Sequence, residues 1–213
     1  MKLIKKYFPQ IKPEQLAAFE RLNQIFPDKN NAVNMISRKD IENFEERHLL
    51  HSLAIAKYIS FKPQTKILDV GTGGGFPGIP LAIMFPDCQF HLVDSIGKKI
   101  NMVNEIIVDL ELENVTATHA RVESLKLQVD FVVSRAVAPI LDIYRWTHKH
   151  LITDNYNDKP NGYLLLKGGN LIPEKNEFYA ATARKFKAYE IPLDIYFQEE
   201  FFETKKLIAI AKK

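Results

Sequence analysis

The sequence has little cysteine, no long apolar run and no large excess of one charge. Its 213 residues include a single cysteine, Cys88, which excludes an intrachain disulfide framework and a multi-cysteine zinc site. No stretch approaches the roughly 18 continuous apolar residues of a membrane span. The lysines near the start are not followed by the apolar run of a secretory signal. We therefore expect a cytoplasmic protein that does not associate with membranes.

The charges nearly balance, and no metal-ligand pattern is present. Lys and Arg number 29 against 26 Asp and Glu, which gives a formal net charge of +3. This excludes a histone-like polycation but leaves room for a local basic patch. The six histidines have neither the HExxH spacing nor another recognisable ligand spacing. The sequence therefore gives no support to a bound metal.

The chain changes character once, near residue 62. Before that point, apolar residues recur at helical spacing. Pro27 and the polar residues after it predict a break between helices, and Ser37 is a candidate N-cap for the helix that follows. We expect an N-terminal helical extension over residues 1–62 and one compact domain over residues 63–213.

From residue 66 onward, short apolar runs alternate with longer segments of helical periodicity. Such alternation indicates βαβ units and a mostly parallel, doubly wound α/β sheet with helices on both faces. A short loop separates the last two runs, so we expect them to pair antiparallel at one edge. The expected strands are 66–70, 89–93, 115–118, 130–134, 163–167, 191–197 and 206–211. The expected helices between them are 78–85, 98–110, 138–150 and 174–186.

The most informative segment is a glycine-rich turn between the first expected strand and the helix after it. Five glycines fall within the eight residues 71–78. Glycine permits positive φ and lets a ligand approach the backbone, and the N-terminus of the next helix favours an anion or a carboxylate. Because open α/β sheets bind ligands outside the carboxyl ends of their strands, the turn predicts a ligand site that includes Gly71 and Gly73.

Two acidic residues narrow the class of ligand. Gly73, Gly75 and Gly78 also satisfy the GxGxxG spacing of dinucleotide sites, whereas the Walker A motif is excluded. Asp94, at the end of the second expected strand, can accept hydrogen bonds from ribose hydroxyls, which dinucleotides and S-adenosylmethionine both contain. Asp69 lies two residues before the first glycine. A carboxylate there suits the ammonium and sulfonium of S-adenosylmethionine better than a pyrophosphate, or else it only holds the loop.

Several segments together resemble one family, the bacterial small-subunit rRNA guanine-N7 methyltransferases (the glucose-inhibited division protein B family). The matching segments are 34–37, 47–48, 69–81, 93–99, 120–123, 133–136 and 165–168. The Gly-Ile-Pro extension of the turn and the Ser-Arg-Ala segment make the resemblance specific, and it covers about residues 30–170. It implies a class I, Rossmann-like methyltransferase fold with a seven-stranded sheet, S-adenosylmethionine as the methyl donor and one guanine of 16S rRNA as the acceptor.

The resemblance also implies site residues. The family's cofactor contacts fall on Gly71, Phe76, Val122, Glu123 and Arg135, with Asp94 in the ribose-binding position. Considered without the family, Phe76 either covers a sugar or adenine face or packs in the core. Val122 and Glu123 follow the third expected strand, where an adenine would lie. Arg135 ends the fourth strand, where it can pair with the donor's carboxylate or a nucleotide phosphate.

The implied reaction needs no general base, because N7 of guanine carries a free lone pair. Alignment of donor and acceptor can supply about 7–11 kcal/mol, and Arg135 is the candidate for positioning. The Asn/Asp-Pro-Pro-Tyr/Phe motif of exocyclic-amine methylation is missing at the fourth strand. Cys88 precedes the second strand, where we expect a buried small apolar residue rather than the nucleophile of pyrimidine methylation.

Three alternatives to a 16S rRNA guanine-N7 methyltransferase stay open. They are a class I methyltransferase with another acceptor, a nicotinamide-dependent oxidoreductase and a non-catalytic RNA-binding factor. The expected partner is 16S rRNA within the small ribosomal subunit or an assembly intermediate, with weak affinity for naked RNA, and we expect a monomer. Two positions depart from the family pattern: Gly74 stands where proline is common, and His51 stands where aspartate is common.

Overall fold

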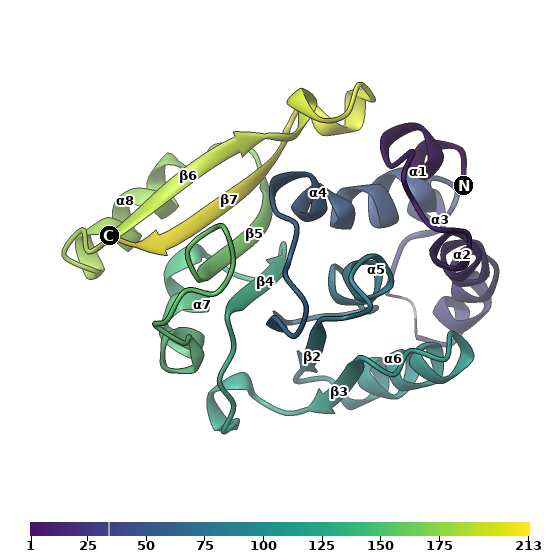
Figure 1. Cartoon of the computed structure of the whole chain (residues 1–213), viewed down its shortest axis with the longest axis horizontal. Coiled ribbons are helices and arrows are strands. Elements are labelled where there is room, and N and C mark those ends of the chain that lie inside the picture. The colour runs from purple at the N-terminus through teal and green to yellow at the C-terminus, as the bar shows by residue number, and fades with distance from the viewer. Residues whose placement is uncertain (34) are drawn as a thin grey trace.

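A seven-stranded sheet forms the centre of the protein, with strand order β3-β2-β1-β4-β5-β7-β6 (Figure 1). The computed structural model describes residues 1–33 and 35–213, without the side chains of Ala32, Arg38 and Lys39. The strands are β1 (Lys66–Val70), β2 (Gln89–Asp94), β3 (Val115–His119), β4 (Phe131–Arg135), β5 (Gly162–Gly168), β6 (Phe186–Pro192) and β7 (Lys205–Lys212). β7 runs antiparallel to β5 and β6, and the other neighbouring pairs are parallel. The expected mostly parallel sheet with an antiparallel edge is confirmed.

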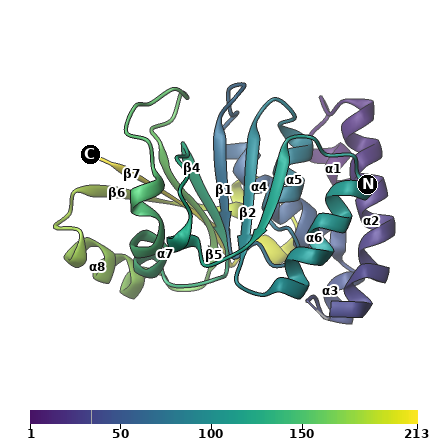
Figure 2. The ribbon, with the colours of Figure 1, turned by 90° about the horizontal axis from the view of Figure 1, so that it is seen from below.

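Helices occupy both faces of the sheet, so the molecule has three layers (Figure 2). One layer holds α1 (Lys2–Tyr7), α2 (Pro13–Val33), α3 (Arg38–Ile41), α4 (His51–Tyr58), α5 (Gly78–Met84) and α6 (Gly97–Asp109). The other holds α7 (Ile140–Thr147) and α8 (Ile172–Ala181). Successive strand residues serve opposite layers: Ile67 belongs to the apolar cluster under the first, Leu68 to the cluster under the second.

The helices before β1 share the apolar cluster of the first layer. Phe19, Leu22 and Phe26 of α2 are fully buried there. The division of the chain near residue 62 stays a prediction. The resemblance segment 34–37 begins at Asn34, which lies outside the described residues. Each helix within residues 1–33 and 35–213 is too short or too polar to cross a lipid bilayer.

The predicted break at Pro27 is wrong, because Pro27 lies inside α2. Contacts on both sides of the proline hold the helix together. Phe26 stacks on Phe44, with ring centroids 4.7 Å apart. After the proline, Lys29 pairs with Glu105 and Asp109 of α6 at 2.9 Å each. Packing and ion pairing here outweigh the missing backbone N–H of proline.

The late part of the chain also differs from the prediction. The sixth strand is β6 rather than 191–197, and the expected helix 174–186 ends at Ala181 as α8. Leu193 begins a short 3₁₀ helix, Leu193–Ile195. Leu193, in this helix, and Phe197, just after it, are both buried. Their apolar spacing therefore reflects a loop that packs on the core and not a strand. Apolar spacing over so few residues does not separate a strand from such a loop.

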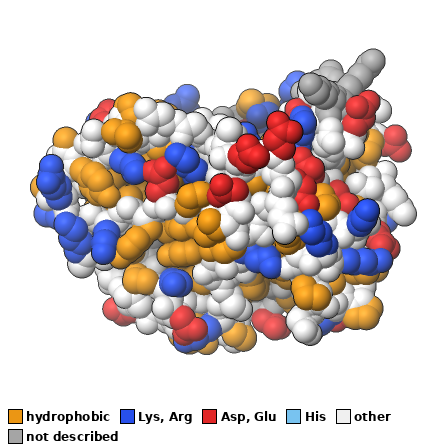
Figure 3. Space-filling model, turned by 90° about the horizontal axis from the view of Figure 1, so that it is seen from above, with side chains coloured by type: hydrophobic (Ala, Val, Ile, Leu, Met, Phe, Trp, Pro, Cys, Tyr) orange, Lys and Arg blue, Asp and Glu red, His pale blue; other side chains and the backbone are white. Residues whose placement is uncertain are grey.

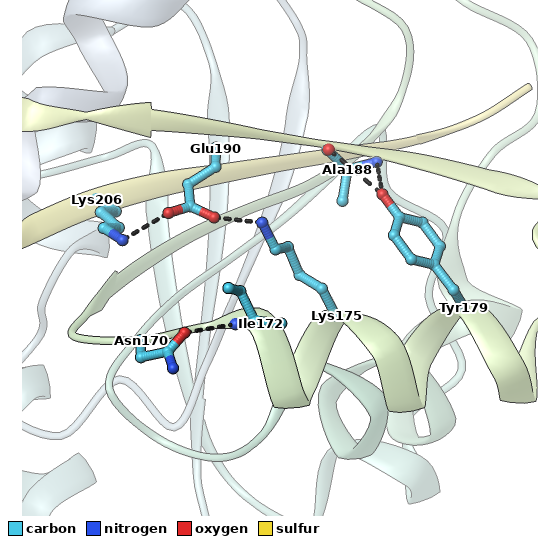
Figure 4. A network of polar contacts seen from close by, with 7 residues as sticks. All are labelled: Asn170, Ile172, Lys175, Tyr179, Ala188, Glu190 and Lys206. Carbon is cyan, nitrogen blue, oxygen red and sulfur yellow. Dashed lines mark hydrogen bonds and ion pairs between the residues drawn. The ribbon is translucent and has the colours of Figure 1, made fainter.

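Polar contacts hold α8 against the edge strand β6 (Figure 4). Glu190 of β6 accepts hydrogen bonds from Lys175 of α8 and Lys206 of β7. Tyr179 of α8 accepts a hydrogen bond from the backbone N–H of Ala188 at 3.1 Å. The half-buried carboxylate therefore links three elements, α8, β6 and β7.

The strand order reverses between β1 and β4, and we use the word crevice for the region at the carboxyl ends of these two strands. From β1 the chain continues to β2 on one side, and from β4 it continues to β5 on the other. In such sheets, ligands bind outside the carboxyl ends of the strands where the order reverses. Asp69 pairs with Val133 in the register of β1 and β4. Continuing that register brings Gly71 opposite Arg135, so the two most informative sequence segments meet at this crevice.

Candidate functional site

The turn after β1 is built from glycines that no other residue replaces without strain. Gly71, Gly73 and Gly75 have φ values of 65°, 57° and 90°. A Cβ on Gly71 would lie 2.6 Å from both Cγ atoms of Val137. The backbone N–H of Thr72 donates to the carbonyl of Val93 at 3.0 Å, which fixes the turn to β2. Thr72, Gly74 and Gly75 are buried, whereas Gly71 and Gly73 are partly exposed at the carboxyl end of β1.

Asp69 holds this turn from below. Its Oδ2 accepts hydrogen bonds from Thr72 Oγ1 at 2.6 Å and from the backbone N–H of Gly78 at 2.9 Å. Its Oδ1 is buried and has no hydrogen-bond partner in the described part of the chain. Burial raises the pKa of Asp69 to about 7, against the opposing effects of Thr72, Gly78 and Arg135. The carboxyl thus holds the loop through Oδ2 and leaves Oδ1 buried without a partner among the described residues.

Asp94 joins the turn to the end of β2. The side chain is 6% exposed. Oδ2 accepts from the N–H of Gly73 at 3.0 Å, and Oδ1 accepts from the N–H of Ile96 at 2.9 Å. Lys99 lies 3.8 Å from Oδ2. Each carboxylate oxygen has a second lone pair, so Asp94 can accept further hydrogen bonds from ligand hydroxyls.

Arg135 lies at the end of β4 and its guanidinium is held on three sides. Nη1 donates to the carbonyl of Arg47 at 3.3 Å, and Nη2 contacts Nδ1 of His48 at 3.0 Å. The guanidinium carbon lies 4.9 Å from the ring centroid of Phe76. Burial lowers the pKa of Arg135 to about 10, opposed by Asp69 and Asp40. The group therefore stays charged at neutral pH and has few orientations available.

His48 acts as the uncharged partner of this guanidinium. It belongs to the π-helix Glu45–Leu50, which continues into α4, and π-helical turns are frequent at functional sites. Burial first, and then the charge of Arg135, lower the pKa of His48 to about 3. The neutral ring accepts through Nδ1 and carries its hydrogen on Nε2. Nε2 is buried without a partner among the described residues.

Phe76 packs in the core rather than at the mouth of the turn. It is 3% exposed, and its ring makes edge contacts with Phe26 at 5.2 Å and Phe44 at 5.6 Å. A Cβ on Gly74 would lie 3.1 Å from Cζ of Phe26. Glycine at this position therefore leaves room for α2, where the proline common in the family would press on Phe26.

Val122 and Glu123 follow β3 in a short 3₁₀ helix, Val122–Ser124. Val122 is 5% exposed and packs in the same apolar cluster as Val93. The backbone N–H of Ala120 donates to the carbonyl of Asp94 at 3.2 Å, which ties this segment to the end of β2. The side chain of Glu123 is exposed. The structure therefore brings the backbone of this segment beside the end of β2 and leaves the Glu123 carboxylate at the surface.

Two residues singled out in the sequence lie in the core. Cys88 is 2% exposed, and burial raises the pKa of its thiol to about 11, so the expectation of a buried small residue is confirmed. His51 is 7% exposed and contacts Phe201 edge-on, with ring centroids 5.5 Å apart. Burial holds the pKa of His51 well below its usual range. A neutral ring thus occupies the position where the family often has aspartate.

Sequence reasoning missed three residues of the crevice. The role of His48 depends on a contact with a residue 87 positions away, and its only signal was the Arg-His pair in the resemblance. Ile96 and Val137 are 41% and 40% exposed although they are apolar. The sequence feature that could have indicated them is an apolar residue two positions after a strand that ends in a charged residue, Asp94 or Arg135. Together they give the crevice apolar walls beside Asp94 and above Gly71.

Sequence comparison matches the chain to one family over most of its length. The model of the family described as GidB, rRNA small subunit methyltransferase G, matches residues 15–195. Proteins named ribosomal RNA small subunit methyltransferase G are similar along the whole chain. The one from Christiangramia forsetii is 49% identical over 100% of this chain and 98% of its own. The one from Bacteroides thetaiotaomicron is 50% identical over 98% of each chain.

Comparison with solved structures adds the fold. A SAM-dependent methyltransferase from Aquifex aeolicus superposes with a TM-score of 0.56 at 14% identity, over 82% of this chain and 98% of that one. A mutant of MtNAS in complex with S-adenosylmethionine superposes with a TM-score of 0.57 at 14% identity, over 99% of this chain and 82% of that one. The sheet of this protein is therefore of the class I methyltransferase type.

Proposed function

The chain belongs to the rRNA small subunit methyltransferase G family, and from this membership we propose that it transfers a methyl group from S-adenosylmethionine to N7 of a guanine in 16S rRNA. The structural observation that supports S-adenosylmethionine as the donor is the turn after β1. There, bare glycine backbone lies above a buried carboxyl whose Oδ1, on Asp69, has no partner in the described chain. Such an oxygen is costly to bury unless a ligand completes its hydrogen bonds.

The residues around the crevice fit the parts of S-adenosylmethionine. The free oxygen of Asp69 suits an ammonium, and the second lone pairs of Asp94 suit ribose hydroxyls. The backbone at Gly71 and Gly73 allows close approach, and Ile96 offers an exposed apolar surface for a neutral heterocycle. The bound donor supplies an electrophilic methyl group on a positively charged sulfur.

Arg135 and His48 then position the groups that meet at the crevice. Two of the donors of Arg135 already contact Arg47 and His48, and its further N–H groups can bind the donor's carboxylate, a phosphate or guanine O6. N7 has to stay free to attack, so the usual bidentate contact of arginine to O6 and N7 does not form in the reactive pose. A histidine with a pKa of about 3 is a poor base, which suits a reaction that removes no proton from its acceptor.

The proposed acceptor constrains how the RNA binds. A-form RNA hides N7 in a deep, narrow groove, so the target guanine is unpaired or turned out of its stack into the crevice. A small-subunit particle as partner, a cytoplasmic location and a monomer that acts as one unit are parts of this proposal. No metal enters it, because the sulfonium itself activates the methyl group.

Mass spectrometry of 16S rRNA tests the proposal. Cells without the gene should lack one N7-methylguanine, and the gene should restore it. Arg135→Ala should fail to restore it, since misplacing reacting groups by about 1 Å can cost roughly 100-fold in rate. The purified variant should keep the fold of the wild type. Identical 16S rRNA with and without the gene would overturn the proposal. Thermal stabilisation by NAD but not by S-adenosylhomocysteine would favour an oxidoreductase instead.

His48 offers a second test of how Arg135 is positioned. His48→Gln keeps an acceptor in reach of the guanidinium, whereas His48→Leu leaves a guanidinium N–H without its partner. A lost hydrogen bond of this kind is worth about 1–3 kcal/mol, so methyl transfer should fall about 5- to 160-fold in His48→Leu and less in His48→Gln. The ring of His48 also stacks on Phe44, with centroids 5.6 Å apart, and equal rates in both variants would show that this packing is its only role.

A further inference from the structure

A groove lies at the opposite end of β5 from the crevice. It has a volume of about 520 Å³ and runs between the end of α4, the segment before β5 and the strands β6 and β7. The polar and aromatic residues at its rim are Tyr58, Lys159, Lys187, Tyr189, Lys212 and Lys213. None of the described residues that line it is acidic. We call it the lysine groove.

The lysines of this groove are held beside aromatic rings. Nζ of Lys159 lies 5.0 Å from the ring centroid of Tyr58, and Nζ of Lys187 lies 4.7 Å from that of Tyr189. Tyr189 is 47% exposed. Figure 3 shows Lys and Arg side chains gathered at the end of the molecule where β6, β7 and the C-terminus lie, beside a band of hydrophobic side chains. Rings and cations are thus interleaved on one open surface.

These lysines differ from the others of the same region. Lys175 and Lys206 are paired with Glu190, and Lys62 is paired with Asp158 at 2.7 Å. By contrast, the side chains of Lys159, Lys187 and Lys212 have no carboxylate within 4.0 Å in the described part of the protein. Lysine on an edge strand can serve to prevent pairing with another sheet. That role would account for Lys187 on β6, but not for Lys159, which comes from a loop.

We propose that the lysine groove binds a single-stranded segment of RNA that is remote from the reacting guanine. The inference rests on the proposed function, since it assigns a second contact to the same RNA substrate. Lysines without a carboxylate partner attract the phosphates, and the exposed ring of Tyr189 offers a face on which a base stacks. The seven residues of β5 separate groove and crevice by about 20 Å. The groove therefore anchors the substrate without touching the chemistry.

Methyl transfer to small subunits that lack the modification tests this anchor. Lys159→Ala/Lys187→Ala should raise the KM for subunits at least about fivefold with kcat unchanged. Log affinity should also fall less steeply with log salt, with a slope smaller in magnitude by about 1.4. Lys2→Ala/Lys12→Ala removes the same charge at the other end of the molecule and should leave KM nearly unchanged. Tyr189→Ala should raise KM about fivefold or more, whereas Tyr189→Phe keeps the ring and should not.

The outcomes separate this inference from the proposed function. If the wild-type protein methylates subunits but the groove variants keep its KM, the inference is wrong and the function stands. An equal rise in KM from the control pair would show that net charge, not the groove, governs binding. Loss of binding to phosphatidylglycerol vesicles, with KM for subunits unchanged, would assign the groove to a membrane and also overturn the inference. Calorimetry with S-adenosylhomocysteine should give the wild-type affinity for every groove variant.

Discussion

Replacing Asp69 by asparagine tests the site most sharply, because burial and hydrogen bonding oppose each other at this carboxyl. It is fully buried, and two donors, Thr72 and Gly78, contact only one of its oxygens. Burial raises its pKa from 3.8 to about 7. Since one pKa unit corresponds to about 1.4 kcal/mol, the ionised carboxylate costs the folded protein about 4 kcal/mol.

This cost depends on pH with a defined sign. Below pH 3.8 the carboxyl of Asp69 is protonated in folded and unfolded chains alike. As the pH rises towards 7 the unfolded chain loses this proton first, so the folded state loses stability, and above about pH 7 the loss is complete and constant. Asp69→Asn has no charge to bury. The free energy of unfolding of Asp69→Asn minus that of the wild type should therefore increase by up to about 4 kcal/mol between about pH 4.5 and pH 8.

The same substitution should weaken binding of a ligand that carries an ammonium. Affinity of the wild type for S-adenosylhomocysteine should fall as the pH drops below about 7, because a proton on Asp69 removes its charge. Asp69→Asn should bind more weakly and without this pH dependence. Urea unfolding and calorimetry on the same samples measure both effects.

A matched control is Asp130→Asn, because Asp130 directly precedes β4 and so lies at the opposite end of the parallel strands from Asp69. Asp130 is 8% exposed, and its Oδ2 accepts from the N–H of Lys66 at 2.8 Å. The control should change stability and leave the affinity for S-adenosylhomocysteine unchanged. If the free energies of unfolding of the wild type and Asp69→Asn changed with pH in parallel, the cost assigned to the buried charge would be refuted. Unchanged affinity in Asp69→Asn would reduce Asp69 to a residue that only holds the loop.

Three further substitutions probe the turn and its supports. Gly71→Ala should reduce binding of S-adenosylhomocysteine at least about tenfold by calorimetry, because its Cβ would meet Val137 at 2.6 Å and its φ is positive; wild-type affinity would contradict the close approach. Phe26→Ala should lower the free energy of unfolding by about 3–5 kcal/mol in urea, since it removes a fully buried ring that packs on Phe76. Cys88→Ala should retain methyl transfer within about twofold. A large loss of activity would show that the thiol takes part in the reaction.

The sequence predicted the first five strands to within about two residues. The central strands β1, β4 and β5 are buried on both faces, so they appear as nearly unbroken apolar runs bounded by polar residues. The edge strand β6 escaped prediction because it is alternately exposed and half-buried, and because Leu193 and Phe197 pack on the core from a loop. Pro27 predicted a break because proline lacks a backbone N–H, but contacts made by Phe26 and Lys29 keep α2 continuous.

The candidate site divides in the same way. Asp69, Gly71 and Asp94 could be found from the sequence because each stands at a fixed position relative to a strand end, where parallel strands converge by topology alone. The neutral His48 beside Arg135, the packing of Phe76 in the core and the exposed Ile96 and Val137 could not be found in this way. Local sequence determined where the glycine turn and the two carboxylates of the candidate site lie relative to the strand ends. Only the tertiary structure decided which side chains are buried, because burial and the pKa shifts that it causes depend on neighbours far away in the chain.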